Sequence, residues 1–354
     1  MESFNTLRDI DFKDKRVLVR VDFNVPIEKN KIADDTKIRA ALPTIKAILK
    51  QKPEKIILMS HLGRPGGKKV KSLNMDKVAK KLSTLLKKKI KKVDKCFGID
   101  IQKIKEDIIM LENLRFYPEE EKNSPAFAKK IADLGDVYVN DAFAVCHREH
   151  ASVSAITNFL PSCAGLLLEK ELKMYQIIEK ARRPFIVIIG GAKLETKIPL
   201  IKAFVKKADY ILLGSSTGKH VLDKPENRWM LDNKKIIFPE DYIKDLDIGK
   251  KTIKNYTYLI STANTICWNG PLGMFEKKKY EQGTRAVAKA IARNKRATTL
   301  IGGGSTEQAA KKYSIMKKVT HVSTGGGASL LVWQGAELPG VKALQQSYRR
   351  QQHL

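Results

Sequence analysis

The sequence lacks the features of several protein classes. No apolar run approaches the roughly 20 residues of a membrane-spanning helix, and the start, MESFNTLRDI, has neither the basic region nor the apolar core of a signal peptide. Only four cysteines occur, far apart and without a C-x-x-C pair: Cys96, Cys146, Cys163 and Cys267. This spacing favours reduced, mostly buried thiols over zinc ligands or disulfides. We therefore expect a cytoplasmic protein.

Acidic residues are scarce beside basic ones: 38 against 67, a formal net charge of +29. Such a charge is compatible with a nucleic-acid or anionic partner, but no zinc-finger, RRM or KH motif accompanies it. Much of the excess lies in lysine clusters such as KKLSTLLKKKIKKVDK, residues 80–95, whose leucines and Ile90 keep helical spacing. This pattern predicts a solvated amphipathic helix rather than a dedicated nucleic-acid site.

The chain is long enough for two domains with sizeable cores, at 354 residues and 43% hydrophobic residues. Short apolar strands recur, each followed by a loop and a helical pattern: RVLVRVDF, KIILMS, DIIMLEN, DVYVNDAF, FIVIIGG, YILLGS, TICWNG, TTLIGGG and THVSTGGG. Strands that alternate with helices predict an α/β fold with doubly wound parallel sheets.

A connecting helix is predicted over AGLLLEKELKMYQIIEKA, residues 164–181, because Arg183-Pro184 then disfavours helix. We therefore expect a first domain over 1–163, this helical hinge, and a second domain over 182–338. In the first domain the strand ends carry charged residues, whereas in the second they carry glycines.

Polar residues follow the strands of the first domain, where ligands of open parallel sheets bind. They are Asp22, Asn24, His61, Arg64, Arg115, His147 and Arg148, with Lys37 and Arg39 entering the next helix. One such arginine is commonly a surface ion-pair former, and RVLVRVDFNVP alone could be a half-exposed edge strand. Several convergent cations beside one carboxylate and one amide favour a site for a small phosphorylated hydroxy acid.

Three stretches of the second domain combine a strand, a glycine turn and a helix start: GGAKLETKIPLI, IGGGSTEQAA and STGGGASLL. Glycines permit close backbone approach, and exposed N–H groups at a helix N-terminus attract phosphate. Lys193 and Lys197 are four residues apart, so on a helix they share one face. GSSTGKH, residues 214–220, departs from a P-loop in spacing and in His220, and we interpret it as a turn.

RVLVRVDFNVP, SHLGRP, DAFAVCHR, GLLLEKEL, GGAKLETKI, TICWNGPLGMFE, IGGGSTEQ and HVSTGGGASL with LPGVKAL occur in the order expected of phosphoglycerate kinase. The sequence resembles that family over nearly its whole length. The resemblance implies reversible phosphoryl transfer from ATP to 3-phosphoglycerate, with ADP and 1,3-bisphosphoglycerate as products, Mg²⁺ with the nucleotide, a hinge between the domains and a monomer. It also implies that the tail, residues 339–354, returns to the first domain.

The resemblance assigns roles residue by residue. Six residues match the phosphoglycerate site: Asp22, Asn24, His61, Arg64, Arg115 and Arg148. Lys193 and Lys197 match the lysines that meet the nucleotide phosphates and the transferring group. Asn269 resembles a phosphate-side contact, Glu276 the ribose carboxylate, and Gly302, Gly303, Gly304, Ser305 and Thr306 the phosphate loop.

Two positions depart from the family pattern. Lys37 stands where the family has the arginine that stabilises the transferred phosphoryl, so a slower reaction is expected unless Arg39 substitutes. Ser305 stands where an aspartate normally attends the magnesium, which predicts weaker metal binding, with Glu307 as a candidate surrogate. GSSTGK also replaces the usual glycine-rich turn on the adenine side.

Two hypotheses follow. The first is an active phosphoglycerate kinase with variant residues at Lys37 and Ser305, which the otherwise intact substrate motifs favour. The second is a catalytically impaired, basic relative that binds nucleic acid or another anion through its charge. Turnover measured with 3-phosphoglycerate, ATP and a magnesium titration distinguishes them.

Overall fold

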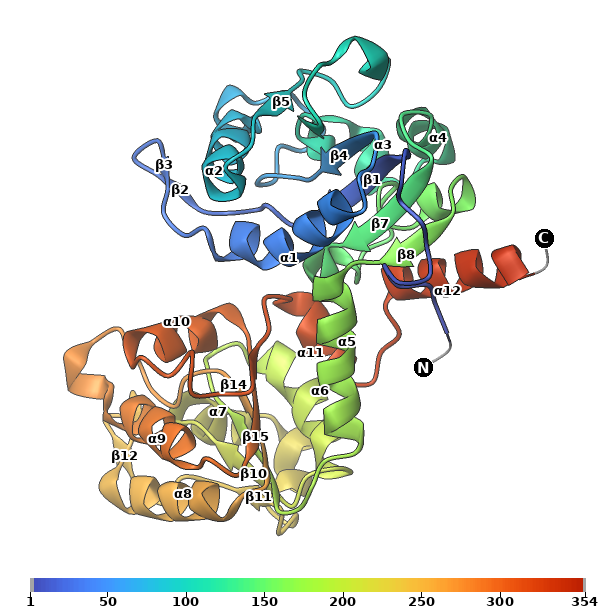
Figure 1. Cartoon of the computed structure of the whole chain (residues 1–354). Coiled ribbons are helices and arrows are strands. Elements are labelled where there is room, and N and C mark those ends of the chain that lie inside the picture. The colour runs from blue at the N-terminus through green and yellow to red at the C-terminus, as the bar shows by residue number, and fades with distance from the viewer. Residues whose placement is uncertain (1–2, 353–354) are drawn as a thin grey trace. The chain divides into compact units, whose positions relative to one another are not determined.

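The computed structural model describes residues 3–352, which divide into two compact units. The first consists of Met1–Leu172 and Glu337–Leu354, and the second of Lys173–Ala336. Each unit is an α/β layer structure with a parallel six-stranded sheet (Figure 1). The predicted fold class, α/β with two doubly wound parallel sheets, is therefore confirmed.

The sheet of the first unit has the strand order β5-β6-β4-β1-β7-β8, with every pair parallel. Its strands are β1 (Arg16–Val21), β4 (Lys55–Met59), β5 (Ile90–Lys92), β6 (Ile108–Met110), β7 (Val137–Asp141) and β8 (Ser162–Ala164). Its helices are α1 (Thr36–Lys50), α2 (Asp76–Leu86), α3 (Pro118–Glu121), α4 (Pro125–Ala132) and α12 (Pro339–Gln352), and β2 (Ile27–Glu28) pairs with β3 (Lys31–Ile32) in a hairpin.

The stretch RVLVRV forms β1, a central strand between β4 and β7 rather than an edge strand. Val17, Val19 and Val21 join the core cluster that also contains Ile38 of α1 and Val78 of α2. Because side chains alternate along a strand, Leu18 and Arg20 face the other side of the sheet. A polar residue within β1 is therefore buried whichever way it points.

One predicted helix is wrong in its second half. The amphipathic helix expected over 80–95 ends with α2 at Leu86, because Lys87 adopts a left-handed conformation with φ of +55°. Ile90 then lies on the edge strand β5 and pairs with Ile108 of β6. The helical spacing of the apolar residues was misleading at Ile90, because this residue belongs to the strand that follows α2.

The sheet of the second unit has the order β11-β10-β9-β14-β15-β16, again parallel throughout. Its strands are β9 (Phe185–Ile189), β10 (Tyr210–Leu213), β11 (Ile236–Ile237), β14 (Thr265–Asn269), β15 (Thr298–Gly302) and β16 (His321–Val322), and β12 (Tyr242–Ile243) pairs with β13 (Asp247–Ile248). The helices are α6 (Leu194–Val205), α7 (Ser215–His220), α8 (Lys250–Thr262), α9 (Gln282–Arg293), α10 (Gly304–Lys312) and α11 (Gly327–Trp333).

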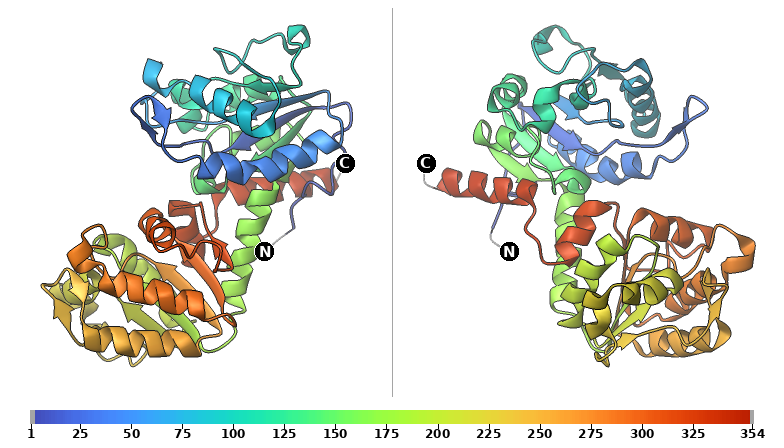
Figure 2. Two further views of the ribbon diagram at one scale, coloured as in Figure 1. Left: turned by 60° about the vertical axis from the view of Figure 1, so that its left-hand side comes forward. Right: turned by 180° about the vertical axis from the view of Figure 1, so that it is seen from behind.

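Both faces of this second sheet are covered, as the views in Figure 2 show. Ile186 and Ile188 of β9 belong to the cluster that contains Tyr256 of α8 and Val287 of α9. Phe185 and Val187, which alternate with them, belong to the cluster of Leu200 and Phe204 on α6. All nine strands predicted from the sequence are present; the short β5, β8 and β11 were not predicted.

The helix α5 (Leu166–Glu179) lies inside the range predicted for the connecting helix, and the division between the units falls within it. Its first turn is capped by Asp141, the last residue of β7, whose Oδ1 accepts hydrogen bonds from the backbone N of Leu167 (2.8 Å) and of Leu168 (3.3 Å). Complete burial raises the pKa of Asp141 to about 7. The start of α5 is thus held by a carboxyl group that titrates near neutrality.

Stability is expected to fall as the pH rises through the range in which Asp141 loses its proton. The folded-state pKa lies above the ordinary carboxyl value of 3.8, so the folded chain binds the proton more tightly between about pH 4 and 7. The loss over that window is up to about 4 kcal/mol. Urea unfolding at pH 5 and pH 8 should show this loss in the wild type, and Asp141→Asn should remove most of it. An unchanged pH dependence in the variant would refute the assignment.

Candidate functional site

In the first unit, a polar cluster lies at the carboxyl ends of the central strands. Asp22 follows β1, is 6% exposed, and accepts a hydrogen bond from Lys37 Nζ of α1 at 2.6 Å through Oδ2. Its Oδ1 accepts from the backbone N of Asn24 at 3.1 Å and lies 4.0 Å from Nδ1 of His61, which follows β4. The structure therefore brings together four residues that the sequence predicted for the site.

Arg20 lies beneath this cluster and is fully buried. Its Nε donates to Ser152 Oγ at 2.8 Å, and its Nη2 lies 3.9 Å from the carboxylate of Glu120, also fully buried. Although Arg20 lies on the same face of β1 as Asp22, it does not face a ligand, because a guanidinium inside the sheet must pair with buried acceptors. Arg20 therefore has a structural role next to the site rather than direct contact with a ligand.

His61 is a neutral hydrogen-bond donor in this arrangement. Arg20 Nη2 lies 3.3 Å from His61 Nδ1, and since a guanidinium can only donate, Nδ1 must accept and Nε2 must carry the proton. Burial and the nearby charge of Arg20 hold the pKa of His61 well below its usual value. A neutral imidazole can therefore donate from Nε2 to a ligand oxygen over the whole physiological pH range.

Arg115 adds a buried cation whose hydrogen-bond donors are only partly used. It lies in the short 3₁₀ turn Leu114–Phe116 after β6, is 4% exposed, and donates from Nη1 to the carbonyl oxygen of Gly63 at 2.9 Å. Its Nε is 3.2 Å from Glu121 Oε1 but without hydrogen-bond geometry. Burial and then Arg20 lower the pKa of Arg115, with Arg148 contributing. This environment favours a bound anion, which would stabilise the charged guanidinium.

The other predicted residues of this half-site lie nearer the surface. Asn24 Oδ1 accepts from the backbone N of Gly63 at 2.9 Å and so fixes the SHLGRP loop that carries Arg64. Arg64 is exposed and Arg148 is half-buried, and within residues 3–352 neither forms an ion pair. Both are free to meet an anionic ligand.

Arg39 is not brought to the cluster. Residues two apart on a helix point about 200° apart, so Arg39 and Lys37 leave α1 on opposite sides. Arg39 instead forms an ion pair with Asp35 at 2.8 Å, and Asp35 also binds Lys81 of α2 at 2.9 Å. Nothing in this arrangement supports Arg39 as a replacement for the arginine that Lys37 displaces.

In the second unit, Lys197 is the central cation. It lies on α6, is 8% exposed, and donates from Nζ to Oδ1 of Asn269, the last residue of β14. Asn269 Nδ2 in turn donates to the carbonyl oxygen of Gly302 at 2.7 Å. Burial lowers the pKa of Lys197 to about 8. A half-desolvated ammonium at the carboxyl ends of the strands is suited to bind phosphate oxygens.

The expectation that Lys193 and Lys197 share one helix face is wrong. Lys193 is the N-cap residue of α6, with φ −88° and ψ +83°, so the helical spacing rule does not apply to it. Lys193 is exposed, whereas Lys197 is buried. Lys193 remains at the start of the same helix, and among the described residues its ammonium group has no hydrogen-bond or ion-pair partner.

The glycine loop after β15 approaches Asn269 closely. Gly303 has φ +96°, and a Cβ atom there would lie 2.8 Å from Asn269 Nδ2, so a side chain at this position would be strained. Gly304 and Ser305 are exposed at the start of α10. Thr306 also has a structural contact, because its buried Oγ1 accepts from the backbone N of Gly270 at 2.6 Å and ties the two strand ends together. Glu276 is exposed in the segment after β14.

The residues of this loop do not fit a metal ion held by the protein. No carboxylate lies within residues 302–306, and Glu307, the candidate surrogate, forms an ion pair with Lys311 at 2.8 Å. Among the described residues, no three His, Cys, Asp or Glu side chains are grouped as a metal site would require. Ser305 offers one neutral hydroxyl, so a magnesium ion here would depend on ligands that the nucleotide brings.

Two further expectations can be compared with the structure. GSSTGKH is not a turn: Gly214 caps the short helix α7, which follows β10 in the βα rhythm. The cysteines are all free and buried, as predicted. Glu120 and Ser152 could not be recognised from the sequence, because an acidic run and a serine resemble ordinary surface residues until Arg20 is seen to need partners.

Among the described residues, no helix is both long and apolar enough to span a membrane.

A family model described as phosphoglycerate kinase matches residues 7–224 and 217–336. The chain is 44% identical to the phosphoglycerate kinase of Dictyoglomus turgidum, over 96% of this chain and 98% of the relative. It is 40% identical to that of Pelotomaculum thermopropionicum over the same shares.

Solved structures agree with the sequence comparisons. The structure of phosphoglycerate kinase from Coxiella burnetii has a TM-score of 0.86 and 32% identity, over 98% of this chain and 100% of that one. The crystal structure of the Pyrococcus horikoshii phosphoglycerate kinase has a TM-score of 0.86 and 30% identity, over 98% and 99%.

Proposed function

The chain belongs to the phosphoglycerate kinase family, and from this premise we propose how its two half-sites share the reaction. The enzyme transfers a phosphoryl group reversibly between ATP and the carboxylate of 3-phosphoglycerate, a step of glycolysis that yields ADP and 1,3-bisphosphoglycerate.

The cluster of the first unit is proposed to hold 3-phosphoglycerate. Arg64, Arg115 and Arg148 bind its phosphate, since guanidinium groups match phosphate oxygens in a bidentate way. Asp22 accepts a hydrogen bond from its hydroxyl group, and Asn24 donates one to that group. His61 donates a hydrogen bond from Nε2 to an oxygen of the acid. The observation that carries this assignment is the buried, incompletely paired Arg115 beside Arg20, because a buried cation in that state calls for an anion.

The second half-site is proposed to hold the nucleotide. Lys197 and Asn269 bind phosphate oxygens. The backbone N–H groups of Gly303, Gly304 and Ser305 donate to further phosphate oxygens. Lys193 binds the phosphates from the solvent-exposed side of the site. Glu276 holds the ribose hydroxyls. In the transfer a carboxylate oxygen of the acid forms the new bond to the γ-phosphorus while the bond to the leaving ADP oxygen breaks. Lys37 and Lys197 neutralise charge on the migrating group, and no side chain acts as a nucleophile.

This division of roles extends to the whole chain. We propose a phosphoglycerate-binding domain over 1–163, a hinge over 164–181, a nucleotide-binding domain over 182–338 and a tail over 339–354 that supports the first domain. The reaction requires acid and nucleotide to meet, so the proposal includes domain closure during turnover. We also propose that the protein acts as a monomer, and its place in glycolysis supports a cytoplasmic location.

Turnover tests this function directly. A coupled assay with ATP and 3-phosphoglycerate, titrated with Mg²⁺, should show saturable activity. The alternative, an impaired relative that binds nucleic acid in place of catalysis, has no support from the comparisons. It would be favoured by an absence of turnover at saturating metal in a protein that remains folded.

Restoring the family arginine should accelerate the enzyme. Lys37→Arg would add one charge-assisted hydrogen bond to the migrating phosphoryl, a gain of about 1.5 kcal/mol or roughly tenfold in kcat. Arg39→Lys is the matched control, since Arg39 faces Asp35, and it should change kcat by less than about twofold. If Lys37→Arg slowed the enzyme, the proposed position of Lys37 at the transferred group would be wrong.

A carboxylate at position 305 should tighten metal binding. Ser305→Asp would add an anionic oxygen ligand where the described loop has none, so the Mg²⁺ concentration for half-maximal activity should fall roughly tenfold. Ser305→Asn keeps the size without the charge and serves as the control. Equal behaviour of the two variants would show that the metal is not near this residue.

A further inference from the structure

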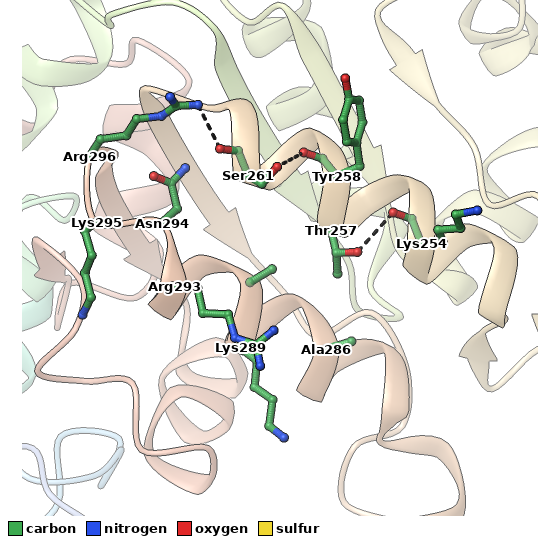
Figure 3. A pocket seen from close by; sticks show the side chains of 11 residues that line it. Lys254, Thr257, Tyr258, Ser261, Ala286, Lys289, Arg293, Asn294, Lys295 and Arg296 are labelled. Atoms are coloured by element: carbon green, nitrogen blue, oxygen red, sulfur yellow. Dashed lines mark hydrogen bonds between the residues drawn. The ribbon is translucent and has the colours of Figure 1, made fainter.

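A basic groove lies on the second unit between α8 and α9, apart from the residues assigned above. Its cavity has a volume of about 770 Å³. Figure 3 shows the two helices with their long side chains displayed. We call this the α8–α9 groove; its lining residues that carry the argument are Lys254, Tyr258, Lys289, Arg293, Lys295 and Arg296.

The lining of the groove is positively charged and contains no acidic residue. Neither α8, nor α9, nor the segment 294–297 contains an aspartate or glutamate. The nearest acid in sequence, Glu281, is paired with Lys312 at 2.7 Å. Lys254, Lys289, Arg293 and Lys295 are exposed, and within the described chain none of them forms an ion pair. Four cations are thus available to an external anion.

Structural roles account for only part of this set. Arg296 Nη2 donates to the carbonyl oxygen of Ser261 at 2.9 Å, and Asn294 Nδ2 donates to those of Ile260 and Ala263, so both hold the end of α8. Arg293 in the last turn of α9 is favourable for the helix dipole. Neither explanation covers Lys254 or Lys289, which lie away from the helix C-termini.

The arrangement indicates an extended anion with aromatic groups. In Figure 3, Lys254 and Tyr258 extend from α8, while Lys289 and Arg293 extend from α9 and Lys295 follows it, so the charges are spread over both helices and do not converge on one point. A single phosphate would need convergent donors. The side chain of Tyr258 is 68% exposed, which leaves its ring free to stack.

We propose that the α8–α9 groove binds single-stranded nucleic acid. Successive phosphates contact Lys254, Lys289, Arg293 and Lys295, and one base stacks on Tyr258, the combination by which proteins bind single strands without sequence preference. Within the described lining only Tyr258 is a large apolar side chain, which disfavours a membrane surface, and an acidic peptide would leave the ring unused. This activity is additional to the kinase reaction and does not depend on the site assignments above.

The test is fluorescence anisotropy with a labelled 12-nucleotide oligo(dT) and the full chain, across a range of salt concentrations. Four phosphate contacts predict a slope of log K against log salt of about −2.8. Lys289→Gln with Arg293→Gln should reduce the magnitude of the slope to about 1.4, and Tyr258→Leu should weaken binding at least about fivefold. Kinase activity of these variants should stay unchanged.

The matched control is Lys13→Gln with Lys105→Gln, two exposed lysines of the first unit that remove the same charge. It should bind the oligonucleotide like the wild type. Equal weakening in the control and groove variants would show non-specific attraction, and displacement of the oligonucleotide by saturating ATP would place it at the nucleotide site. Either result overturns the proposal, as would binding to phosphatidylserine vesicles with no binding to the oligonucleotide.

Discussion

Replacing Lys197 with methionine is expected to lower kcat by about 10³-fold, the loss typical of a positioned group that stabilises transition-state charge. Methionine fills a similar volume but brings no cation to the phosphates, and it leaves Oδ1 of Asn269 without its donor. Steady-state kinetics with ATP and 3-phosphoglycerate measure the effect. A loss confined to KM for ATP would mean that Lys197 binds nucleotide without assisting the transfer.

The pH dependence of kcat and kcat/KM is a second test of the role of Lys197. Burial lowers the pKa of Lys197 to about 8, so the free enzyme loses this charge as the pH rises through 8. The value of kcat/KM for ATP should therefore fall above about pH 8, while kcat should hold to higher pH because bound phosphates stabilise the ammonium. Lys202→Met, an exposed change on the same helix, should leave both profiles intact.

The largest expected effect on stability comes from Arg20. Arg20→Met should lower the free energy of unfolding by about 3–5 kcal/mol, because it leaves the carboxylate of Glu120 buried without its cation. Urea unfolding measures the change. Adding Glu120→Gln to this variant removes the uncompensated charge and should recover part of the loss.

Arg16→Met is the matched control on the same strand. Arg16 pairs with Asp136 at 2.6 Å, but the two side chains are 29% and 39% exposed, so the pair contributes at most about 1 kcal/mol. If Arg16→Met were as damaging as Arg20→Met, burial of the Arg20 network would not be the cause. If Arg20→Met were harmless, the network would not support the site.

Much of the architecture could be predicted because its signals are local. Each central strand is a short apolar run that ends in a turn, and each helix between strands has apolar residues at helical spacing. The alternation of strands and helices can therefore be recognised without tertiary information. Short edge strands gave no such signal. Ile90 fitted a helical period as well as a strand, and only its pairing with Ile108 decides between them.

The site was predictable to the extent that parallel strands bring their carboxyl ends together. That rule alone places Asp22, His61 and Arg115 in one unit. In the other unit, Asn269 was assigned only through the family resemblance. The rule does not specify which way a side chain points. Arg20 is two residues before Asp22 on the same face of the strand, yet it lies inside the sheet, because its partners Glu120 and Ser152 come from distant segments.

Lys193 and Thr306 show a second limit. Both lie at helix starts, where the regular spacing of side chains does not yet apply, and a one-residue shift decides whether a side chain faces solvent or the interior. Lys193 is exposed at an N-cap, and Thr306 is buried against Gly270. Their roles depend on cap geometry that the sequence does not specify.

The most direct test of the central claim is a crystal structure of the chain with 3-phosphoglycerate and a non-hydrolysable ATP analogue. The account predicts the acid's phosphate on Arg64, Arg115 and Arg148, its hydroxyl on Asp22, and the nucleotide phosphates on Lys197 and the loop 302–305. Density for the acid away from Asp22 and Arg115, or nucleotide phosphates out of reach of Lys197, would contradict it.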